Sequence, residues 1–457
     1  MNTNILFITV DDMNYDSIGL YNEKSITPNI DKLLKEGLFF KHAHVNVSVC
    51  QPSRQCIMTG KYPHNNGSHG FSPISHSVNT LQELLLEKGY INGIISKVGH
   101  LAPIHKYCWD YIKEFNNKKY YWGRKPEYYY QCSKEFFDRV KNQEQPFFLM
   151  VNSNDPHRPF AGSQQELDKF GVNTEASRTW ESEEVEVPGF LPDIPDVRKE
   201  IAQYCTSVHR ADQSIGCVLQ ALDESGFADN TIVMFLSDNG MAFPFAKTNC
   251  YLNSTKTPLI IKWPNIIEPE SVDEDNIVTG VDIMPTILDI MDIPYNEKDY
   301  DGRSFMNVLL GKNDERKRDK AFTLFNANFK RMNFEMRSVL TKKYGYIFNE
   351  WSDGESRFFN ESMSGLTFKA MEREGQNNPD VDQRVKMFLY REKEEFYNFE
   401  NDPNGLVNLI NDETYKNIID EYKNFLYEDM KRSNDPRLKA FESMCIAGNS
   451  TPSKGRI

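Results

Sequence analysis

A cysteine, a proline, a hydroxyl and an arginine stand together in the run Cys50-Gln51-Pro52-Ser53-Arg54. Pro52 restricts φ to about −65° and favours the first turn of a helix, which the apolar residues after Arg54 can continue. Cys50 would then lie at a helix N-terminus, where free backbone N–H groups attract anions, and Arg54 adds a permanent charge suited to sulfate or phosphate. The run therefore predicts either a reactive group beside an anion or a buried structural cysteine.

Hard oxygen ligands follow two of the predicted strands. Residues 4–10 and 231–236 are apolar runs typical of buried strands in an α/β sheet, where ligands bind beyond the carboxyl ends of the strands. The side chains that follow these runs are Asp11, Asp12, Asp238 and Asn239. Adjacent carboxylates repel each other unless a cation lies between them, and Ca²⁺ and Mg²⁺ prefer carboxylate and amide oxygens. The pattern predicts a metal site at this edge of the sheet.

Cationic and imidazole side chains follow the same strands or their neighbours. The strand predicted over residues 90–96 leads to a lysine and a histidine, and the strand at 146–151 leads to a rigid polar loop at 152–159. The candidate groups are Lys97, His100, Asp155, His157, Arg158 and Lys247. Taken alone, Lys97 is better explained as a solvated loop residue and His100 as a hydrogen-bonded packing residue. Taken together, the candidate groups predict a site for an anion at the edge that carries the acidic residues.

Composition limits the classes of function. The 457 residues are 39% hydrophobic and 26% charged, typical of a globular chain, and no apolar run approaches the roughly 20 residues of a membrane span. The net charge of −13 disfavours a nucleic-acid partner, and an anionic substrate would need a locally basic pocket. The eight cysteines form no C-x-x-C pair, which favours a reducing compartment. Residues 1–5 do not resemble a secretory signal, so we expect a cytoplasmic protein, or a periplasmic one whose signal has been removed.

Two domains are predicted, an α/β domain over 1–320 and a smaller α+β domain over 321–457. Helical spacing indicates helices at 197–226 and 414–430. Two segments are expected to be less regular. They are residues 107–130, an irregular region or a wall on which sugars stack, and the polar residues 354–382, a loop that edges the site.

These motifs resemble the sulfatase family of the alkaline-phosphatase superfamily. The resemblance rests on Cys50-x-Pro52-Ser53-Arg54, on the starting run Ile8-Thr9-Val10-Asp11-Asp12, on Ser237-Asp238-Asn239-Gly240, and on Asp402-Pro403 with Asn408-Leu409. Asp155-Pro156-His157-Arg158 is most similar to the sulfamidase branch, which acts on N-sulfoglucosamine of heparan fragments. The implied fold is a large mixed, mostly parallel sheet between helices, followed by a small antiparallel sheet with a helix.

The resemblance also implies a chemistry for each candidate residue. A maturation enzyme would oxidise Cys50 to Cα-formylglycine, the nucleophile, and one Ca²⁺ would be bound by that residue with Asp11, Asp12, Asp238 and Asn239. Arg54 and Lys97 would hold the hydrated aldehyde, and His100 would later accept its proton. His157 and Lys247 would bind the sulfate and protonate the leaving atom, while Asp155 and Arg158 would contact the sulfated saccharide.

Two departures from the family pattern bear on specificity. Val98 and Gly99 separate Lys97 from His100, one residue more than the usual spacing, and Lys247 stands where sulfamidases have arginine. The alternatives are an O-sulfatase, a phosphodiester or phosphonate monoester hydrolase using the same site, or a glycan-binding protein in which Cys50 stays a thiol. An oligomer is compatible with all of them.

Overall fold

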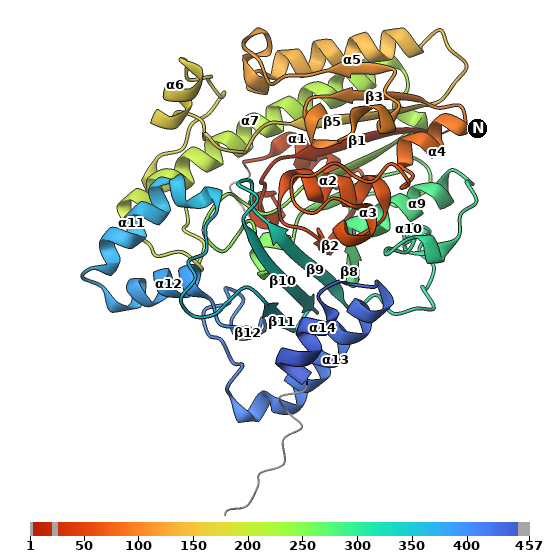
Figure 1. Ribbon diagram of the computed structural model, residues 1–457. Coiled ribbons are helices and arrows are strands. Elements are labelled where there is room, and N and C mark those ends of the chain that lie inside the picture. Colours follow the sequence, from red (N-terminus) through yellow and green to blue (C-terminus); the bar gives the residue numbers. More distant parts are fainter. Residues whose placement is uncertain (1–2, 21–25, 447–457) are drawn as a thin grey trace, which may run out of the picture.

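The computed structural model describes residues 3–20 and 26–446. Its larger sheet contains eight strands in these residues (Figure 1). Their order across the sheet is β4 (Tyr111–Lys113), β3 (Ile91–Ile95), β5 (Phe147–Ser153), β1 (Asn4–Val10), β6 (Thr231–Ser237), β7 (Leu259–Lys262), β2 (Leu38–His44) and β8 (Ser271–Thr279). β7 is antiparallel to both neighbours, and the other pairs are parallel. The predicted mixed, mostly parallel sheet is confirmed.

The central strand β1 contributes to a hydrophobic core on each face of the sheet. Alternate side chains of a strand point to opposite faces, so Leu6 and Ile8 join one core while Ile5 and Phe7 join the other. The first core includes residues of α1 (Pro28–Lys35), α5 (Pro126–Val140) and α7 (Pro195–Ser225). The second includes residues of α2 (Cys50–Thr59), α4 (Leu81–Glu87) and α9 (Ile283–Ile290). Burial on both faces explains why β1 is an unbroken apolar run.

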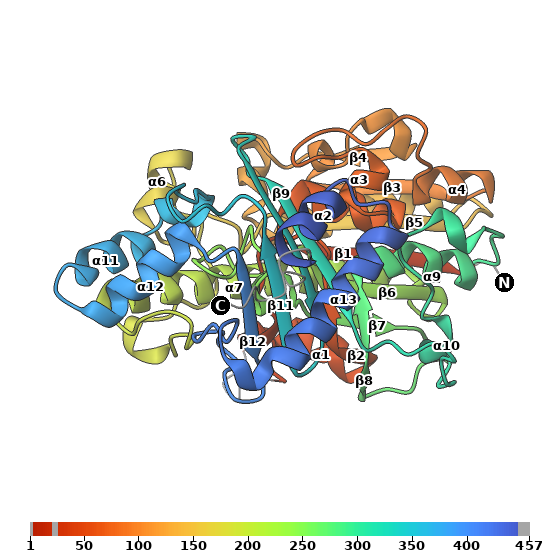
Figure 2. The ribbon, with the colours of Figure 1, turned by 60° about the horizontal axis from the view of Figure 1, so that its bottom comes forward.

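A second sheet follows, antiparallel throughout. Its order is β12 (Glu394–Asn398), β11 (Tyr344–Asn349), β10 (Asn333–Leu340) and β9 (Ala321–Ala327). Helix α13 (Lys416–Arg432) lies against it and buries Tyr422 and Leu426 with Phe348 and Phe396, as Figure 2 shows. The predicted C-terminal antiparallel sheet with its helix is confirmed. The division of the chain into domains at residue 320 stays a prediction.

The segment at 354–382, predicted as a polar loop that edges the site, is largely helical, so the prediction of a loop is wrong. Its predicted place at the edge of the site is confirmed, because Glu361 contacts Lys247 and His157. The segment contains a 3-10 turn (Glu361–Ser364), all of α11 (Leu366–Gly375) and the start of α12 (Pro379–Tyr390). α11 buries Phe368 and Met371 at helical spacing, an apolar face hidden in the sequence among charged residues. The short helices are α3 (Pro63–Asn66), α6 (Gln164–Phe170), α8 (Leu252–Thr255), α10 (Met306–Leu309) and α14 (Leu438–Phe441).

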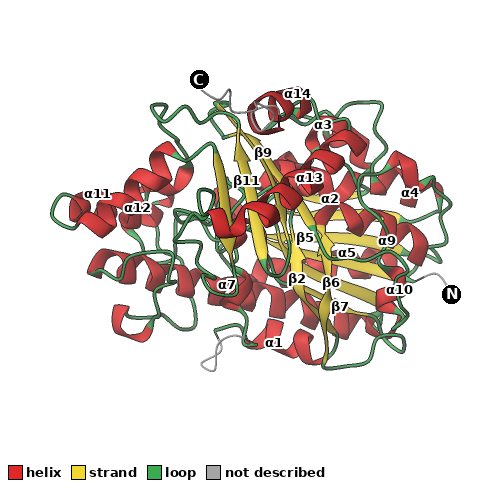
Figure 3. Cartoon of the chain, turned by 90° about the horizontal axis from the view of Figure 1, so that it is seen from below, coloured by secondary structure: helices red, strands yellow, loops and turns green. Residues whose placement is uncertain are grey.

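Helices enclose both sheets in the view of Figure 3. Residues 114–125 of the segment predicted to be irregular hold no strand or α-helix, and α5 begins at Pro126. Among the described helices, none combines the length and the apolar character that crossing a membrane requires.

Candidate active site

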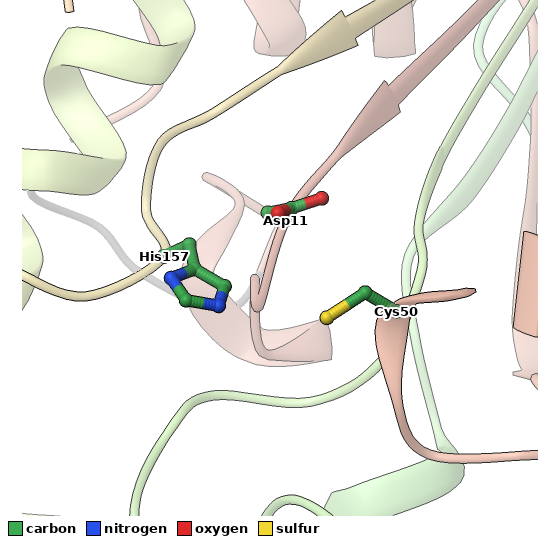
Figure 4. A group of neighbouring side chains, drawn as sticks. All are labelled: Asp11, Cys50 and His157. Atoms are coloured by element: carbon green, nitrogen blue, oxygen red, sulfur yellow. The ribbon is translucent and has the colours of Figure 1, made fainter. Parts of the chain in front are cut away.

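The candidate side chains meet beyond the carboxyl ends of β1, β3, β5 and β6. Asp11 follows β1, His157 stands in the loop after β5, and Cys50 is the first residue of α2. Ligand atoms of these three side chains lie within 4.8 Å of one another, and Figure 4 shows them facing a common space. The parallel order of the strands brings residues more than 100 positions apart to one place.

Arg54 binds two of the carboxylates that follow the strands. Its side chain donates to Asp238 Oδ2 from Nε at 3.1 Å and from Nη2 at 2.8 Å, and it also contacts Asp11. Nη1 donates to Thr9 and Asn152. Burial alone would lower the pKa of Arg54, but the two carboxylates outweigh burial and raise it. Arg54 is therefore a buried, permanently charged anchor beneath the acidic cluster.

A second cation, Lys247, binds the third carboxylate. Its Nζ lies 2.8 Å from Asp12 Oδ2 and 2.9 Å from Glu361 Oε2. Burial opposes the charge of Lys247, yet Asp12 and Glu361 raise its pKa well above the ordinary value. Burial would raise the pKa of Glu361, but the charges of Lys247 and His157 hold this pKa far below its usual range. Glu361 was not named from the sequence, although its segment was expected to edge the site, because it does not directly follow a strand.

The two histidines face the same space in different ways. His157 Nδ1 lies 2.6 Å from the carbonyl oxygen of Arg158, so Nδ1 carries the hydrogen and Nε2 points toward Glu361 Oε1 at 3.5 Å. Nδ1 of His100 is buried and has no hydrogen-bond partner in the described part of the chain. Burial and the charge of Lys97 lower the pKa of His100 well below its usual value. A neutral His100 is equipped to accept a proton.

A pocket of about 380 Å³ opens over the acidic cluster. Among the predicted residues it is lined by Cys50, Lys97, His100, His157 and Arg158. Burial raises the pKa of the Cys50 thiol far above its ordinary value, and the nearby carboxylates add to the rise against the opposing charge of Lys247. The thiol therefore stays protonated at neutral pH, which argues against a thiolate nucleophile despite the helix N-terminus.

The two predicted substrate contacts in the loop after β5 are placed differently. Asp155 is fully buried, does not line the pocket, and accepts from Arg210 Nε at 2.7 Å and from Arg124. Arg158 lines the pocket, and its Nη1 donates to Glu200 at 2.5 Å. Asp155 thus fixes the loop, whereas Arg158 borders the space for a ligand. The sequence gives no signal for these partners, because they lie on other elements up to 55 residues away.

Replacing Arg210 with methionine should destabilise the protein by about 3–5 kcal/mol, because Asp155 and Glu166 would lose a buried cationic partner. A shift of the urea midpoint measures the loss. Arg139→Met, on the exposed side of α5, is the control, and it should change the free energy of unfolding derived from the midpoint by about 0.5 kcal/mol or less. Equal shifts in the two variants would show that the ion pair contributes nothing.

The acidic cluster fits a divalent cation. Asn239 Oδ1 is buried and accepts no hydrogen bond from any described residue, while its Nδ2 donates to Asp12 Oδ1 at 2.7 Å. Burial and the neighbouring Asp11 raise the pKa of Asp238 well above its usual range, although Arg54 opposes the rise. The negative charge is thus incompletely balanced by the resident cations, and the donors are the hard oxygens that Ca²⁺ or Mg²⁺ prefers.

Comparison with known proteins agrees with this geometry. Residues 3–293 match the sulfatase family, and residues 241–358 match the C-terminal region of N-sulphoglucosamine sulphohydrolase. The human N-sulphoglucosamine sulphohydrolase is 29% identical over 95% of this chain and 91% of its own. An ulvan-active sulfatase of Formosa agariphila is 26% identical over 94% of this chain and 80% of its own.

The fold agrees as well. A solved structure described as a complex with its substrate D-glucosamine-2-N,6-O-disulfate superimposes with a TM-score of 0.70, covering 95% of this chain and 99% of that one at 19% identity. Sulfatases generally use a formylglycine and a divalent metal. The chain belongs to the sulfatase family, the hydrolases of sulfate esters and sulfamates.

Proposed function

We propose that this protein removes sulfate from a sulfated saccharide, and that the preferred group is the N-sulfate of N-sulfoglucosamine in heparan fragments. The observation that carries the proposal is the meeting of Cys50, His157 and Lys247 with three carboxylates beside one pocket. The match of residues 241–358 to the sulphoglucosamine branch supports the N-sulfate.

We further propose that Cys50 is converted to Cα-formylglycine by a maturation enzyme of the host. Such a conversion would explain why the structure holds Cys50 in surroundings that disfavour a thiolate. When present, the hydrated aldehyde supplies the oxygen nucleophile. We propose Asp11, Asp12, Asp238 and Asn239, with the modified residue 50, as the ligands of one Ca²⁺, which would offset the charge of the sulfate.

The resident side chains then divide the remaining tasks. Lys247 and His157 both reach Glu361 and would bind the sulfate oxygens. Nε2 of His157 would first take up a proton, and the imidazolium would then give that proton to the departing nitrogen or oxygen. Lys97 contacts Asp11 and lines the pocket beside Cys50, so it would orient the nucleophile. His100, held neutral by burial, would accept the proton of the second hydroxyl group of the modified residue 50. The aldehyde would then re-form and the sulfate bound to it would leave. Arg158 would contact the sugar, and Asp155 would hold the loop.

Matured protein should release sulfate from N-sulfoglucosamine faster than from glucosamine 6-O-sulfate or a uronic acid 2-O-sulfate, by at least about tenfold in kcat/KM. Ion chromatography of free sulfate measures each rate under one set of conditions. The reason is that a site built for the N–S bond must protonate a nitrogen leaving group through His157. A phosphonate monoester with the same aglycone as an aryl sulfate serves as the comparison for reaction class.

Release from O-sulfated sugars alone would refute the N-sulfate preference and leave an O-sulfatase. Faster turnover of the phosphonate than of any sulfate would instead refute sulfatase activity as the main function. An absence of turnover in protein whose residue 50 is fully modified would refute both.

A further inference from the structure

The pocket extends beyond the residues assigned to sulfate chemistry. Its lining also includes Trp122, from the irregular segment after β4, and Phe170, the last residue of α6. The two rings are stacked with centroids 4.6 Å apart and planes 21° from parallel. Both side chains are only half-buried, so aromatic surface faces a ligand space of a highly charged site. Such surface is suited to the apolar face of a sugar ring.

The backbone carrying Trp122 is tied to the catalytic loop. Trp122 has a φ of +51°, a left-handed conformation that is unfavourable for a residue of its size. Its carbonyl oxygen accepts from Asn154 Nδ2 at 2.8 Å, in the loop that carries His157. The next residue, Gly123, also has a positive φ, and a Cβ there would lie 2.3 Å from Asn154 Nδ2. The aromatic wall therefore has a fixed position relative to the sulfate end.

Lys169 differs from the other cations of this pocket. Lys97 contacts Asp11, Arg124 contacts Asp155, and Arg158 contacts Glu200. The ammonium group of Lys169 has no carboxylate or hydrogen-bond acceptor among the described residues, and it lies 5.3 Å from the centre of the Phe170 ring.

Lys169 is exposed and lines the same pocket as Lys97, Arg124 and Glu361. Desolvation by the pocket wall lowers the pKa of Lys169, the charges of Arg124 and Lys97 lower it further, and Glu361 opposes them. Glu114, the other acid of the pocket lining, is engaged with the backbone N–H groups of Val98 and Asn116, both at 3.0 Å. An anion beside Lys169 would thus supply the partner that the protein does not.

We propose that the Lys169 end of the pocket is a subsite for a second anionic group of the saccharide, whose ring packs against Trp122 and Phe170. This inference rests on the proposed sulfohydrolase function and deepens it, since it assigns a substrate with at least two negative charges. The group is a sulfate on the same sugar ring or a carboxylate on the adjoining one. A sulfate and a carboxylate both offer anionic oxygens that accept a hydrogen bond from an ammonium group, so the subsite is assigned to an anion of this kind. The two dianionic probes described below distinguish the sulfate from the carboxylate.

The test measures binding to the Cys50→Ala protein by calorimetry, so that no turnover is required. The probes are N-sulfoglucosamine, its 6-O-sulfated derivative, and a disaccharide that joins N-sulfoglucosamine to an unsulfated uronic acid. One of the two dianionic probes should bind about 5- to 10-fold tighter than N-sulfoglucosamine at low salt. The probe that gains identifies the source of the second anion.

Lys169→Gln should abolish that gain, and Lys199→Gln, which removes an exposed lysine outside this pocket, should keep it. Salt should also shrink the gain in the parent protein, whereas in Lys169→Gln the ratio of the affinities for the three probes should not depend on salt, a response that a structural role for Lys169 would not produce. Trp122→Ala should weaken all three probes by about tenfold.

Equal affinities for the three probes, or a gain that survives Lys169→Gln, would overturn the subsite, as would failure of every probe to bind. The proposed function fails on a different result, namely an absence of sulfate release by the matured protein. If the matured enzyme releases sulfate but the Lys169→Gln variant still prefers the dianionic probes, the proposed function stands and the proposed subsite is refuted.

Discussion

Replacing Cys50 with alanine should reduce sulfate release from every saccharide by at least about 10³-fold, because the group that we propose as the precursor of the nucleophile is removed. The loss should appear in kcat, since the pocket and its cations remain. Lys247 stays bound to Asp12 and Glu361, and Arg54 stays bound to Asp238, without any contribution from the thiol. Initial rates of sulfate release measure the effect, and a circular dichroism spectrum that matches the parent protein shows that the fold is intact.

The matched control is Cys56→Ala, a second buried cysteine on the same helix. It should lower stability by about 1 kcal/mol through a small cavity and leave sulfate release within about twofold. Mass spectrometry of the peptide that contains residue 50 supplies the second readout: matured protein should carry a peptide about 18 Da lighter than the cysteine form. Activity retained in Cys50→Ala, or full activity with an unmodified Cys50, would refute the assignment of the nucleophile.

Residues placed by the strands could be predicted from the sequence. Each apolar run is buried on both faces, so its end marks the edge of the sheet, and the parallel order brings Asp11, Asp238 and His157 together. Type and position together were enough, because a carboxylate directly after such a strand has few other places to lie. The resemblance to sulfatases added the role of Cys50, which position alone left open.

Residues placed by tertiary contacts could not be predicted in this way. Glu361 reaches Lys247 from a segment whose apolar helical face is diluted by charged residues. Asp155 has the residue type and position of a substrate contact, but Arg210 and Arg124 bind its carboxylate away from the pocket. Whether the Asp155 carboxylate points into the pocket or away from it depends on these two arginines, one from α7 and one from the segment before α5. No local sequence pattern reveals such partners.

The cations at the base of the pocket are fixed in position by carboxylates. Arg54 and Lys97 share Asp11, while Lys247 is shared by Asp12 and Glu361, so every cation at the base of the pocket is held by a carboxylate. Such pairs keep the cations charged in spite of burial. An anion entering the pocket then meets fixed charges instead of flexible, solvated ones, which favours binding in spite of the net charge of −13.

Removal of divalent cations by a chelator should lower sulfate release by at least about 100-fold, and Ca²⁺ should restore it. The physical reason is the incomplete neutralisation of Asp238, together with the unused oxygen of Asn239, both fully buried. Binding should also be visible without turnover: Ca²⁺ at about 100 times its dissociation constant should stabilise the folded protein by about 2.7 kcal/mol and raise its melting temperature.

Asp238→Asn should lose most of that rise, because one negative charge of the cluster is removed while the hydrogen bond from Arg54 can still be accepted. Asp138→Asn, on the exposed side of α5, should show the full rise and excludes a general effect of acidic residues. A melting temperature that does not respond to Ca²⁺, in protein whose activity survives chelation, would show that Arg54, Lys97 and Lys247 suffice to neutralise the cluster. The carboxylates would then serve to orient these three cations toward the sulfate, and the acidic cluster would not be a metal site.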